Sequence, residues 1–152
     1  MESQMQFQPQ AELTTLGWRE WVELPDLGLP PIRAKVDTGA RTSALHAFSV
    51  EAFQRDGEDW VRFSLHPLHK DDSEVRHCEA PLVDRREVSD SGGHRELRPV
   101  IRTRMRVGAL EFAAELTLTD RDSMSFRMLL GRTAMNGRFV VNPAASFLCG
   151  SQ

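Results

Sequence analysis

One carboxylate stands out because of the residues around it. The segment Ile32–Val36 alternates apolar with charged residues, which predicts a half-buried strand, and it runs directly into Asp37. Gly39 follows two residues later and lets the chain turn closely behind the aspartate. A carboxylate held on such a turn is a candidate for general acid–base chemistry.

A second motif lies much further along the chain. Met128–Leu130 is a short apolar run that enters Gly-Arg at 131–132, as expected of a buried strand. Together, the strand ending in Asp-Thr-Gly-Ala and the later Leu-Leu-Gly-Arg resemble the two signatures of retropepsin-like aspartic proteases. The resemblance implies that Asp37, with Thr38 and Gly39 of the same motif, forms the catalytic loop, and that the second motif packs behind it as a core strand.

Peptide hydrolysis by this route needs two carboxylates that share one proton. One activates a water molecule, and the other donates a proton to the scissile carbonyl oxygen. A domain with one Asp-Thr-Gly motif therefore needs a second copy, and the simplest supply is a twofold homodimer with Asp37 from each subunit at the axis.

The chain contains one rival motif, Asp90–Gly92, which also reads Asp-Ser-Gly. Polar residues flank it in place of an apolar strand, and a two-lobed monomeric enzyme needs a much longer chain. We interpret the polar stretch Asp84–Glu96 as an exposed β-hairpin with Asp90–Gly93 at its tip. The resemblance makes this hairpin a flap that closes over the substrate and excludes water.

The elements that must position these motifs are mostly strands. Further strands are predicted at 60–65, 97–107, 110–119 and 139–141, with a tight turn at Gly108-Ala109. We expect one short helix over Arg132–Asn136, ended by Gly137, and a helical turn over Ser49–Arg55. The prediction is an all-β domain folded as a retropepsin-like closed β-barrel over residues 16–150, preceded by a disordered tail at 1–15.

Composition narrows the function classes. The 152 residues suit a single domain, and no apolar run is long enough to span a membrane. The polar N-terminus lacks the features of an export signal, so we expect a cytoplasmic protein with reduced Cys78 and Cys149. A net charge of −3 argues against direct nucleic-acid binding. The histidines, including the loose pair His66 and His69, lack metal-ligand spacing.

A tighter resemblance covers most of the chain. It is similar to a bacterial family commonly labelled an ATP-dependent zinc protease and related to RimB. The sequence contains neither a GxxxxGK[ST] loop for ATP nor a zinc motif, so we predict no cofactor and no metal. The segments that carry the resemblance are Gly17–Val22, Lys35–His46, Asp84–Val88, Gly92–His94 and Leu129–Met135.

One departure from the retroviral pattern bears on the substrate. Retroviral relatives usually carry an aspartate two residues after the motif glycine, which pairs with the arginine of Gly-Arg; here that position is Arg41. Two buried guanidinium groups, Arg41 and Arg132, would need an anion between them. The segment 85–106 carries seven arginines against three acidic residues, which adds a local charge of +4. The hypothesis is a cleft that prefers acidic peptide, since arginine binds carboxylates bidentately.

The resemblance supplies a substrate that fits this hypothesis. RimB-like proteins are associated with RimK-type ligases, which add glutamates to the C-terminus of a small-subunit ribosomal protein. It implies an aspartic peptidase that processes poly-glutamate tails, with the ligase as a further partner. An extended peptide would bind as an added β-strand beneath the flaps. The predicted substrate-binding residues are Ala40, Arg41, Arg85, Arg86, Gly92, Gly93, His94 and Arg132.

Two other classes stay open at this stage. A retropepsin-like binding module could hold acidic tails or the ligase without cleaving them, and Asp37→Asn would then leave its function intact. A metal-dependent hydrolase would lose activity to a chelator but not to Asp37→Asn. The strand-and-turn context of Asp37, which the histidines lack, favours the aspartic peptidase.

Overall fold

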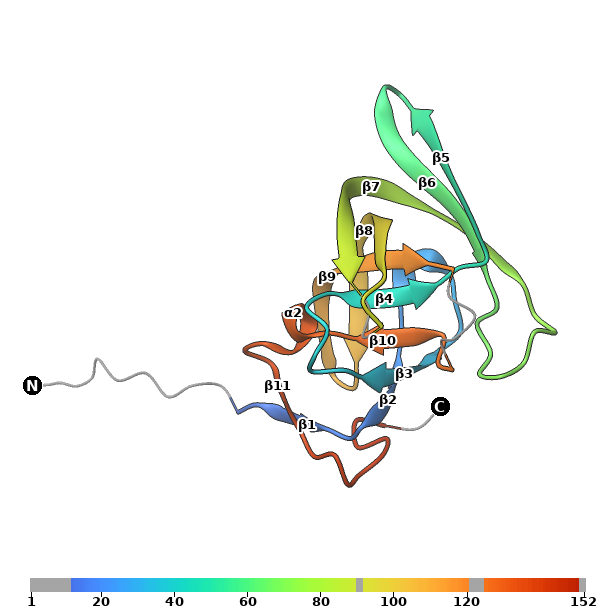
Figure 1. The fold of residues 1–152 in the computed structure, drawn as a ribbon. Helices are drawn as coiled ribbons and strands as arrows, with labels where there is room; N and C mark the ends of the chain where they lie inside the picture. The colour runs from blue at the N-terminus through green and yellow to red at the C-terminus, as the bar shows by residue number, and fades with distance from the viewer. Residues whose placement is uncertain (1–11, 90–91, 121–124, 151–152) are drawn as a thin grey trace, which may run out of the picture.

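The computed structural model describes residues 12–89, 92–120 and 125–150. Within them strands dominate, accompanied by one 3-10 turn, η1 (Pro25–Leu27), and one short helix, α2 (Arg132–Met135). Nine strands form a sheet in the order β2-β3-β10-β4-β9-β8-β7-β6-β5, and β1 and β11 form a separate parallel pair (Figure 1). The strands are β1 (Thr14–Leu16), β2 (Arg19–Val22), β3 (Ile32–Val36), β4 (Ser43–His46), β5 (Ser49–Arg55), β6 (Glu58–Leu65), β7 (Arg76–Ser89), β8 (Arg95–Val107), β9 (Leu110–Thr119), β10 (Met128–Leu130) and β11 (Phe139–Val141).

The predicted mostly-β architecture is confirmed. The strands expected at 32–36, 110–119, 128–130 and 139–141 have the predicted bounds, and those expected at 60–65 and 97–107 each begin two residues earlier. Gly108, with a φ of +59°, turns the chain between β8 and β9 as expected. The short helix after Gly131 forms too, because Gly137 at φ +80° lets the chain leave it for β11.

The helical turn predicted for Ser49–Arg55 is wrong. This segment is strand β5, which pairs with β6 from Ser49–Ser64 to Arg55–Glu58. The two strands are joined by Asp56-Gly57, both at positive φ, which is the two-residue turn that matches the twist of a hairpin. Since the turn fixes the register, cross-strand pairing overrides the weak helical pattern of this segment.

The sheet does not close on itself. Its two ends are β2 and β5, so the predicted closed barrel is not seen in the strand order. An isolated bridge joins the end of β2 to β8: the amide of Glu23 donates to the Arg106 carbonyl, and the amide of Arg106 donates back at 2.8 Å. The β5–β6 hairpin extends away from the strands that this bridge ties together (Figure 1).

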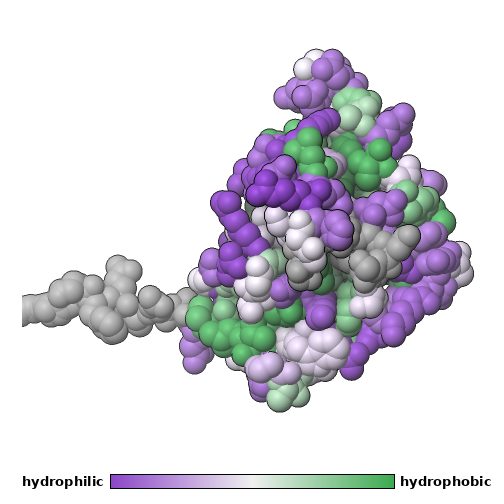
Figure 2. Space-filling model, viewed as in Figure 1, coloured by the Kyte–Doolittle hydropathy of each residue, from purple (hydrophilic) through white to green (hydrophobic). Residues whose placement is uncertain are grey.

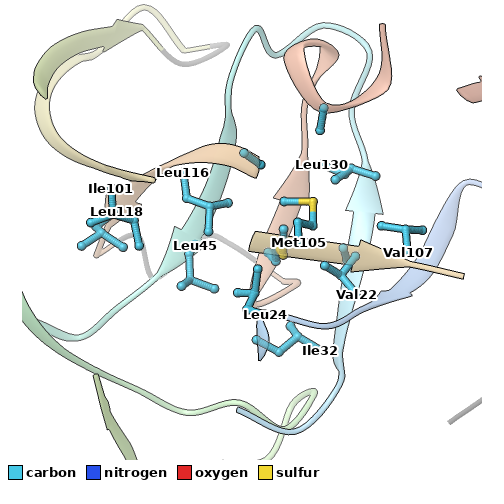
Figure 3. Packing of buried hydrophobic residues seen from close by; sticks show 14 of the residues in the cluster. Val22, Leu24, Ile32, Leu45, Ile101, Met105, Val107, Leu116, Leu118 and Leu130 are labelled. Carbon is cyan, nitrogen blue, oxygen red and sulfur yellow. The ribbon is translucent and has the colours of Figure 1, made fainter. Parts of the chain in front are cut away.

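The hydrophobic core lies between strands from both halves of the chain. Figure 3 shows side chains of β2, β3, β4, β8, β9 and β10 meeting in one cluster, among them Leu45, Met105 and Leu130 with no exposed surface. Met128 and Leu130 both belong to the core, so packing fixes the strand that runs beside Asp37. Hydrophobic residues on the outer face gather in separate patches among hydrophilic ones (Figure 2).

A buried carboxylate holds the two ends of the described chain together. Glu20 has no exposed surface, and its carboxylate accepts hydrogen bonds from the amides of Gly17 (2.6 Å), Leu148 (2.9 Å) and Cys149 (3.0 Å). A Cβ at Gly17 would lie 2.3 Å from the carbonyl oxygen of Ala145, so only glycine fits there. The segment 145–149 is thereby fixed against β2. β1 begins at Thr14, inside the tail expected at 1–15, of which residues 1–11 lie outside the described part.

Candidate active site

Asp37 sits where three segments meet. It follows β3 directly, and β3 pairs in parallel with β10, with Val36 opposite Leu130. The amide of Asp37 donates to the carbonyl of Leu130 at 2.9 Å, and the amide of Val36 donates to the carbonyl of Trp18 at 2.9 Å. The backbone on both sides of the carboxylate is therefore anchored by core strands rather than left in a free loop.

The Asp-Thr-Gly turn holds its own aspartate. Oδ1 of Asp37 accepts a hydrogen bond from the amide of Gly39 at 2.9 Å, and the amide of Ala40 donates to the Asp37 carbonyl at 3.2 Å. A Cβ at Gly39 would lie 3.2 Å from Oδ1, which is tight, so glycine lets the amide approach the carboxylate. Asp37 is half-buried while Thr38 and Gly39 are exposed, so the carboxylate is fixed in place and still open to solvent.

The predicted Gly-Arg motif packs against this turn. The amide of Gly131 donates to Oγ of Ser43 at 3.0 Å, and a Cβ at Gly131 would lie 2.7 Å from the carbonyl carbon of Thr42. The amide of Arg132 donates to the carbonyl of Ala40 at 2.8 Å. The expectation that the second motif lies behind the Asp37 turn thus agrees with the structure.

The two arginines expected to face each other in the cleft are both exposed. Nη1 of Arg132 donates to the carbonyl of Thr38 at 3.0 Å, so its guanidinium braces the Asp-Thr-Gly turn directly. Within the described residues neither Arg41 nor Arg132 forms an ion pair with a carboxylate. The idea of two buried like charges is wrong for the single chain, because water solvates both groups.

The expected hairpin forms, although most of its arginines are not free to bind a substrate. β7 and β8 pair from Leu82–Ile101 to Ser89–Arg95, and Gly93 at φ +85° lies in the turn; Asp90 and Ser91 of the predicted tip lie outside the described residues. Gly92, Gly93 and His94 are exposed near this tip.

Most arginines of the hairpin are already paired with carboxylates. Arg86 bonds to Asp84 at 2.7 Å and to Glu115 at 2.8 Å, and these bonds lower the pKa of Asp84 and raise that of Arg86. Arg95 bonds to Glu87 at 3.0 Å. Arg85 is exposed, and its side chain has no acidic partner in the described segments. Of the arginines predicted to bind substrate, Arg86 is therefore engaged within the fold.

The sequence reasoning missed Arg98, which links the hairpin to the site. Only 7% of this residue is exposed; Nε bonds to Glu96 at 3.1 Å, and Nη1 contacts Oγ1 of Thr117 at 3.5 Å. Thr117 in turn donates to the carbonyl of Ser43 at 3.4 Å, and Ser43 holds Gly131. A chain of hydrogen bonds thus runs from the base of the hairpin to the turn that carries Asp37. Alternation of charged and apolar residues along β8 gave no sign of it.

The side chains that could bind a metal ion do not cluster in the described part of the chain. Among the described residues no group of three His, Cys, Asp or Glu side chains could hold a metal ion. Cys78 and Cys149 are free, and burial raises the pKa of each thiol to about 11. His66 stacks on Phe48, whereas His69 packs against Phe126. No described helix is long and apolar enough to cross a membrane.

The fold and the Asp37 turn define a retropepsin-like class of protein: a mostly-β chain whose Asp-Thr-Gly turn follows one core strand and is held by the Gly-Arg end of another. A family model described as "Retropepsin-like aspartic endopeptidase RimB" matches residues 15–152, and the chain belongs to this RimB-like family. The resemblance drawn from the sequence motifs is thereby confirmed.

Relatives carry a different activity in their names. The chain is 47% identical over 135 residues to a probable alpha-L-glutamate ligase of Desulfotalea psychrophila, covering 89% of this chain and 29% of that protein. It is 49% identical to one of Parasynechococcus marenigrum, with the same coverage. The chain thus spans about 30% of the length of the curated relatives it matches.

The chain also resembles a solved structure. A crystal structure of a protein of unknown function from Legionella pneumophila superposes with a TM-score of 0.74 at 26% identity, and the match covers 90% of this chain and 98% of that one.

Proposed function

We propose that this protein is an aspartic peptidase that acts as a homodimer with one Asp37 from each subunit. The observation that carries the proposal is the Asp37 turn: one carboxylate, open to solvent, fixed by backbone bonds to β10 and by the amide of Gly39. The described residues offer no second acidic group on this turn. The partner subunit's Asp37 is the simplest source of the second carboxylate that the reaction needs.

The pair would work by sharing one proton. The ionised Asp37 takes a proton from a water molecule as its oxygen attacks the scissile carbonyl carbon, and the protonated one donates its proton to the carbonyl oxygen. Collapse of the resulting diol returns a proton to the leaving amine and breaks the carbon–nitrogen bond. Thr38 and Gly39 keep the carboxylate in position, and the hairpin tip with Gly92, Gly93 and His94 closes over the bound chain.

The substrate that we propose is an acidic peptide tail, such as the poly-glutamate added by RimK-type ligases to a small-subunit ribosomal protein. The relatives named as glutamate ligases contain a region like this chain, which supports a shared substrate and a RimK-type ligase as a partner. Arg41, Arg85 and Arg132 support it too, because they are exposed and lack acidic partners in the described structure. Arg86 would act indirectly, through its bonds to Asp84 and Glu115. The setting would be cytoplasmic.

The test is cleavage of a glutamylated peptide followed by mass spectrometry. Wild-type protein should remove glutamates with or without a chelator, and Asp37→Asn should slow cleavage by about 10³-fold, the size of a lost general acid–base group. Asp59→Asn, the same change at an exposed position of the β5–β6 hairpin, is the matched control and should cleave normally. Binding without cleavage by every form would identify a binding module instead, and chelator-sensitive cleavage that survives Asp37→Asn would identify a metal-dependent hydrolase.

The shared dyad has its own test. When wild-type protein is mixed and re-equilibrated with a threefold excess of Asp37→Asn protein, the mixed dimers contain one usable carboxylate. The activity per wild-type chain should then fall to about one quarter, because few wild-type pairs remain. Activity that stays constant per wild-type chain would show that each subunit works alone.

A further inference from the structure

A second group of cationic side chains lies on the face of β2 and β3 that points away from the core. We call it the stacked-arginine site; it consists of Arg19, Arg33, His69, Trp18, Trp21 and Phe147. All six are half-buried, so part of each side chain is open to water and solutes. They come from β2, β3, the segment after β6 and the segment near the C-terminus, and the fold alone brings them together.

The two arginines of this site are held by aromatic rings. The guanidinium carbon of Arg19 lies 4.6 Å from the ring centre of Trp18 and 4.9 Å from that of Phe147. The guanidinium carbon of Arg33 lies 5.2 Å from the same Phe147 ring and 5.8 Å from Trp21. Phe147 thus serves both arginines, and such contacts fix the direction of a guanidinium without neutralising its charge.

Two polar nitrogens at this site lack a hydrogen-bond partner. Nε of Arg33 and Nδ1 of His69 are both buried, and neither has a hydrogen-bond partner. Arg19 donates from Nε to Oγ of Ser146 at 3.2 Å, a neutral acceptor. Neither arginine forms an ion pair within the described chain. Because buried polar groups are nearly always satisfied in proteins, these nitrogens call for a partner from outside the chain, and the Nε–H of Arg33 calls for an acceptor.

Four cations act on His69. Burial and then the cations Arg33, Lys70, Arg127 and Arg19 lower the pKa of this imidazole. Arg127 is bound to Asp72, but no acidic group is held against the two stacked arginines in the part of the chain described here. The local field therefore favours an anion.

The backbone is strained where it builds the site. Phe147 has a φ of +54°, a left-handed conformation that a bulky residue seldom adopts. It is held there because its own amide donates to the carbonyl of Arg19 at 2.9 Å, and the next two amides donate to buried Glu20. Strain maintained by several independent bonds is typical of functional positions, and here it places the ring within reach of both arginines.

We propose that the stacked-arginine site binds carboxylates of an acidic peptide, as a second contact beyond the Asp37 cleft. Planar guanidinium groups fixed on rings suit planar carboxylates, which accept two parallel bonds. Lys35 follows Arg33 on β3, and Asp37 comes directly after this strand, so the cations lead along β3 toward the Asp37 turn. The proposal deepens the proposed function, on which its choice of acidic peptide rests: a tail long enough to reach this site would be held while its end is cut.

The first test measures binding in the Asp37→Asn protein, so that the peptide is not consumed. The probe is a fluorescein-labelled hexaglutamate, with hexaglutamine as the uncharged control and free glutamate and inorganic phosphate as competitors. Arg33→Gln should weaken hexaglutamate binding by at least about ten-fold, the effect of one charged hydrogen-bonding group. Arg104→Gln is the matched control: it removes the same charge from an exposed arginine already paired with Asp26 and Glu111, and should change binding less than about two-fold.

A second test locates the peptide without relying on Arg33→Gln. The sequence has three tryptophans, Trp18, Trp21 and Trp60, and Trp60 lies on the β5–β6 hairpin. In an NMR titration with hexaglutamate, the indole signals of Trp18 and Trp21 should shift while that of Trp60 stays in place. The proposal would be overturned if the indole signal of Trp21 did not shift and Arg33→Gln bound hexaglutamate as tightly as the parent protein. It would also be overturned if Arg33→Gln and Arg104→Gln lost affinity equally. Competition by phosphate as strong as by glutamyl peptide would show a general anion site and overturn the choice of carboxylates.

These outcomes separate the two proposals. If peptide binding depends on Arg33 but the protein cleaves nothing, the stacked-arginine site is supported and the peptidase function is not. If cleavage depends on Asp37 but binding does not depend on Arg33, the peptidase function is supported and the stacked-arginine site is not.

Discussion

The molecule carries two sets of arginines that differ in what their guanidinium groups face. In the β7–β8 hairpin, Arg86, Arg95 and Arg98 are each bonded to a carboxylate. In the stacked-arginine site, Arg19 and Arg33 face aromatic rings and have no acidic partner within the described chain. The first set uses its charge to hold strands together, and the second leaves its charge available to a ligand.

This difference shows why a local charge count is a poor guide to a binding surface. The segment 85–106 has the larger excess of arginine, yet carboxylates that lie next to it in the fold neutralise most of it. The outward face of β2 and β3 has fewer arginines, drawn from separate strands. Three-dimensional pairing, rather than density along the chain, decides which cations a partner can use.

The largest effect expected from this comparison is at Arg98. Replacing it in Arg98→Met removes a nearly buried cation and leaves Glu96 and Thr117 without its bonds. Because breaking a mostly buried pair leaves one charge uncompensated, we expect a loss of about 2 kcal/mol in the free energy of unfolding. Urea denaturation followed by fluorescence measures it. The double variant Arg98→Met/Glu96→Gln should recover part of the loss, and an unchanged single variant would mean that the paired arginines do not stabilise the fold.

At Arg33, by contrast, we expect a substitution to raise the free energy of unfolding. Arg33→Met removes the buried, unpaired Nε and keeps an unbranched side chain against Trp21 and Phe147. An unsatisfied buried donor costs about 1–3 kcal/mol, and the two cation–π contacts that are lost contribute about 1–2 kcal/mol together. The free protein should therefore be more stable by about 0.5 kcal/mol while binding hexaglutamate more weakly.

Thermal unfolding with and without hexaglutamate checks both halves of this expectation. A lower midpoint for Arg33→Met without ligand would show that the rings alone stabilise the arginine. In that case arginines would stabilise the fold both in the β7–β8 hairpin and in the stacked-arginine site.

Parts of this architecture could be predicted from sequence because their signals are local. Apolar residues recur at every second position of β9 from Leu110 to Leu118, and Asp37 follows a strand of the same kind, so the sequence predicts both strands with their bounds. The Asp56-Gly57 turn that makes β5 a strand is a local signal too.

The stacked-arginine site and the Arg98 network could not be found this way. Phe147 reaches Arg19 across more than a hundred residues of chain, and its position depends on a buried carboxylate that the sequence shows only as one more glutamate. Closure of the predicted barrel, which the strand order leaves unconfirmed, rests on a weaker signal. Alternation predicts strands and their buried faces, whereas closure depends on which edges meet.

The smallest expected effect is on the titration of His69. It tests the charge of the stacked-arginine site while both arginines stay in place. Burial and the cations Arg33, Lys70, Arg127 and Arg19 lower the pKa of this imidazole in the folded protein. The unfolded chain then binds the proton more readily than the folded one at pH values between the lowered pKa and the usual one. Stability should therefore rise with pH through that range and be lost as the solution is acidified.

An NMR titration of the imidazole signals measures this directly, and His69→Gln both assigns the signal and should flatten the slope of stability in that range. Hexaglutamate should raise the pKa of His69, because an anion among these cations favours the protonated ring. A pKa in the free protein at or above the usual value would mean that the charges near Arg33 are already neutralised. A lowered pKa that hexaglutamate leaves unchanged would place the peptide elsewhere and return the acidic tail to the Asp37 cleft alone.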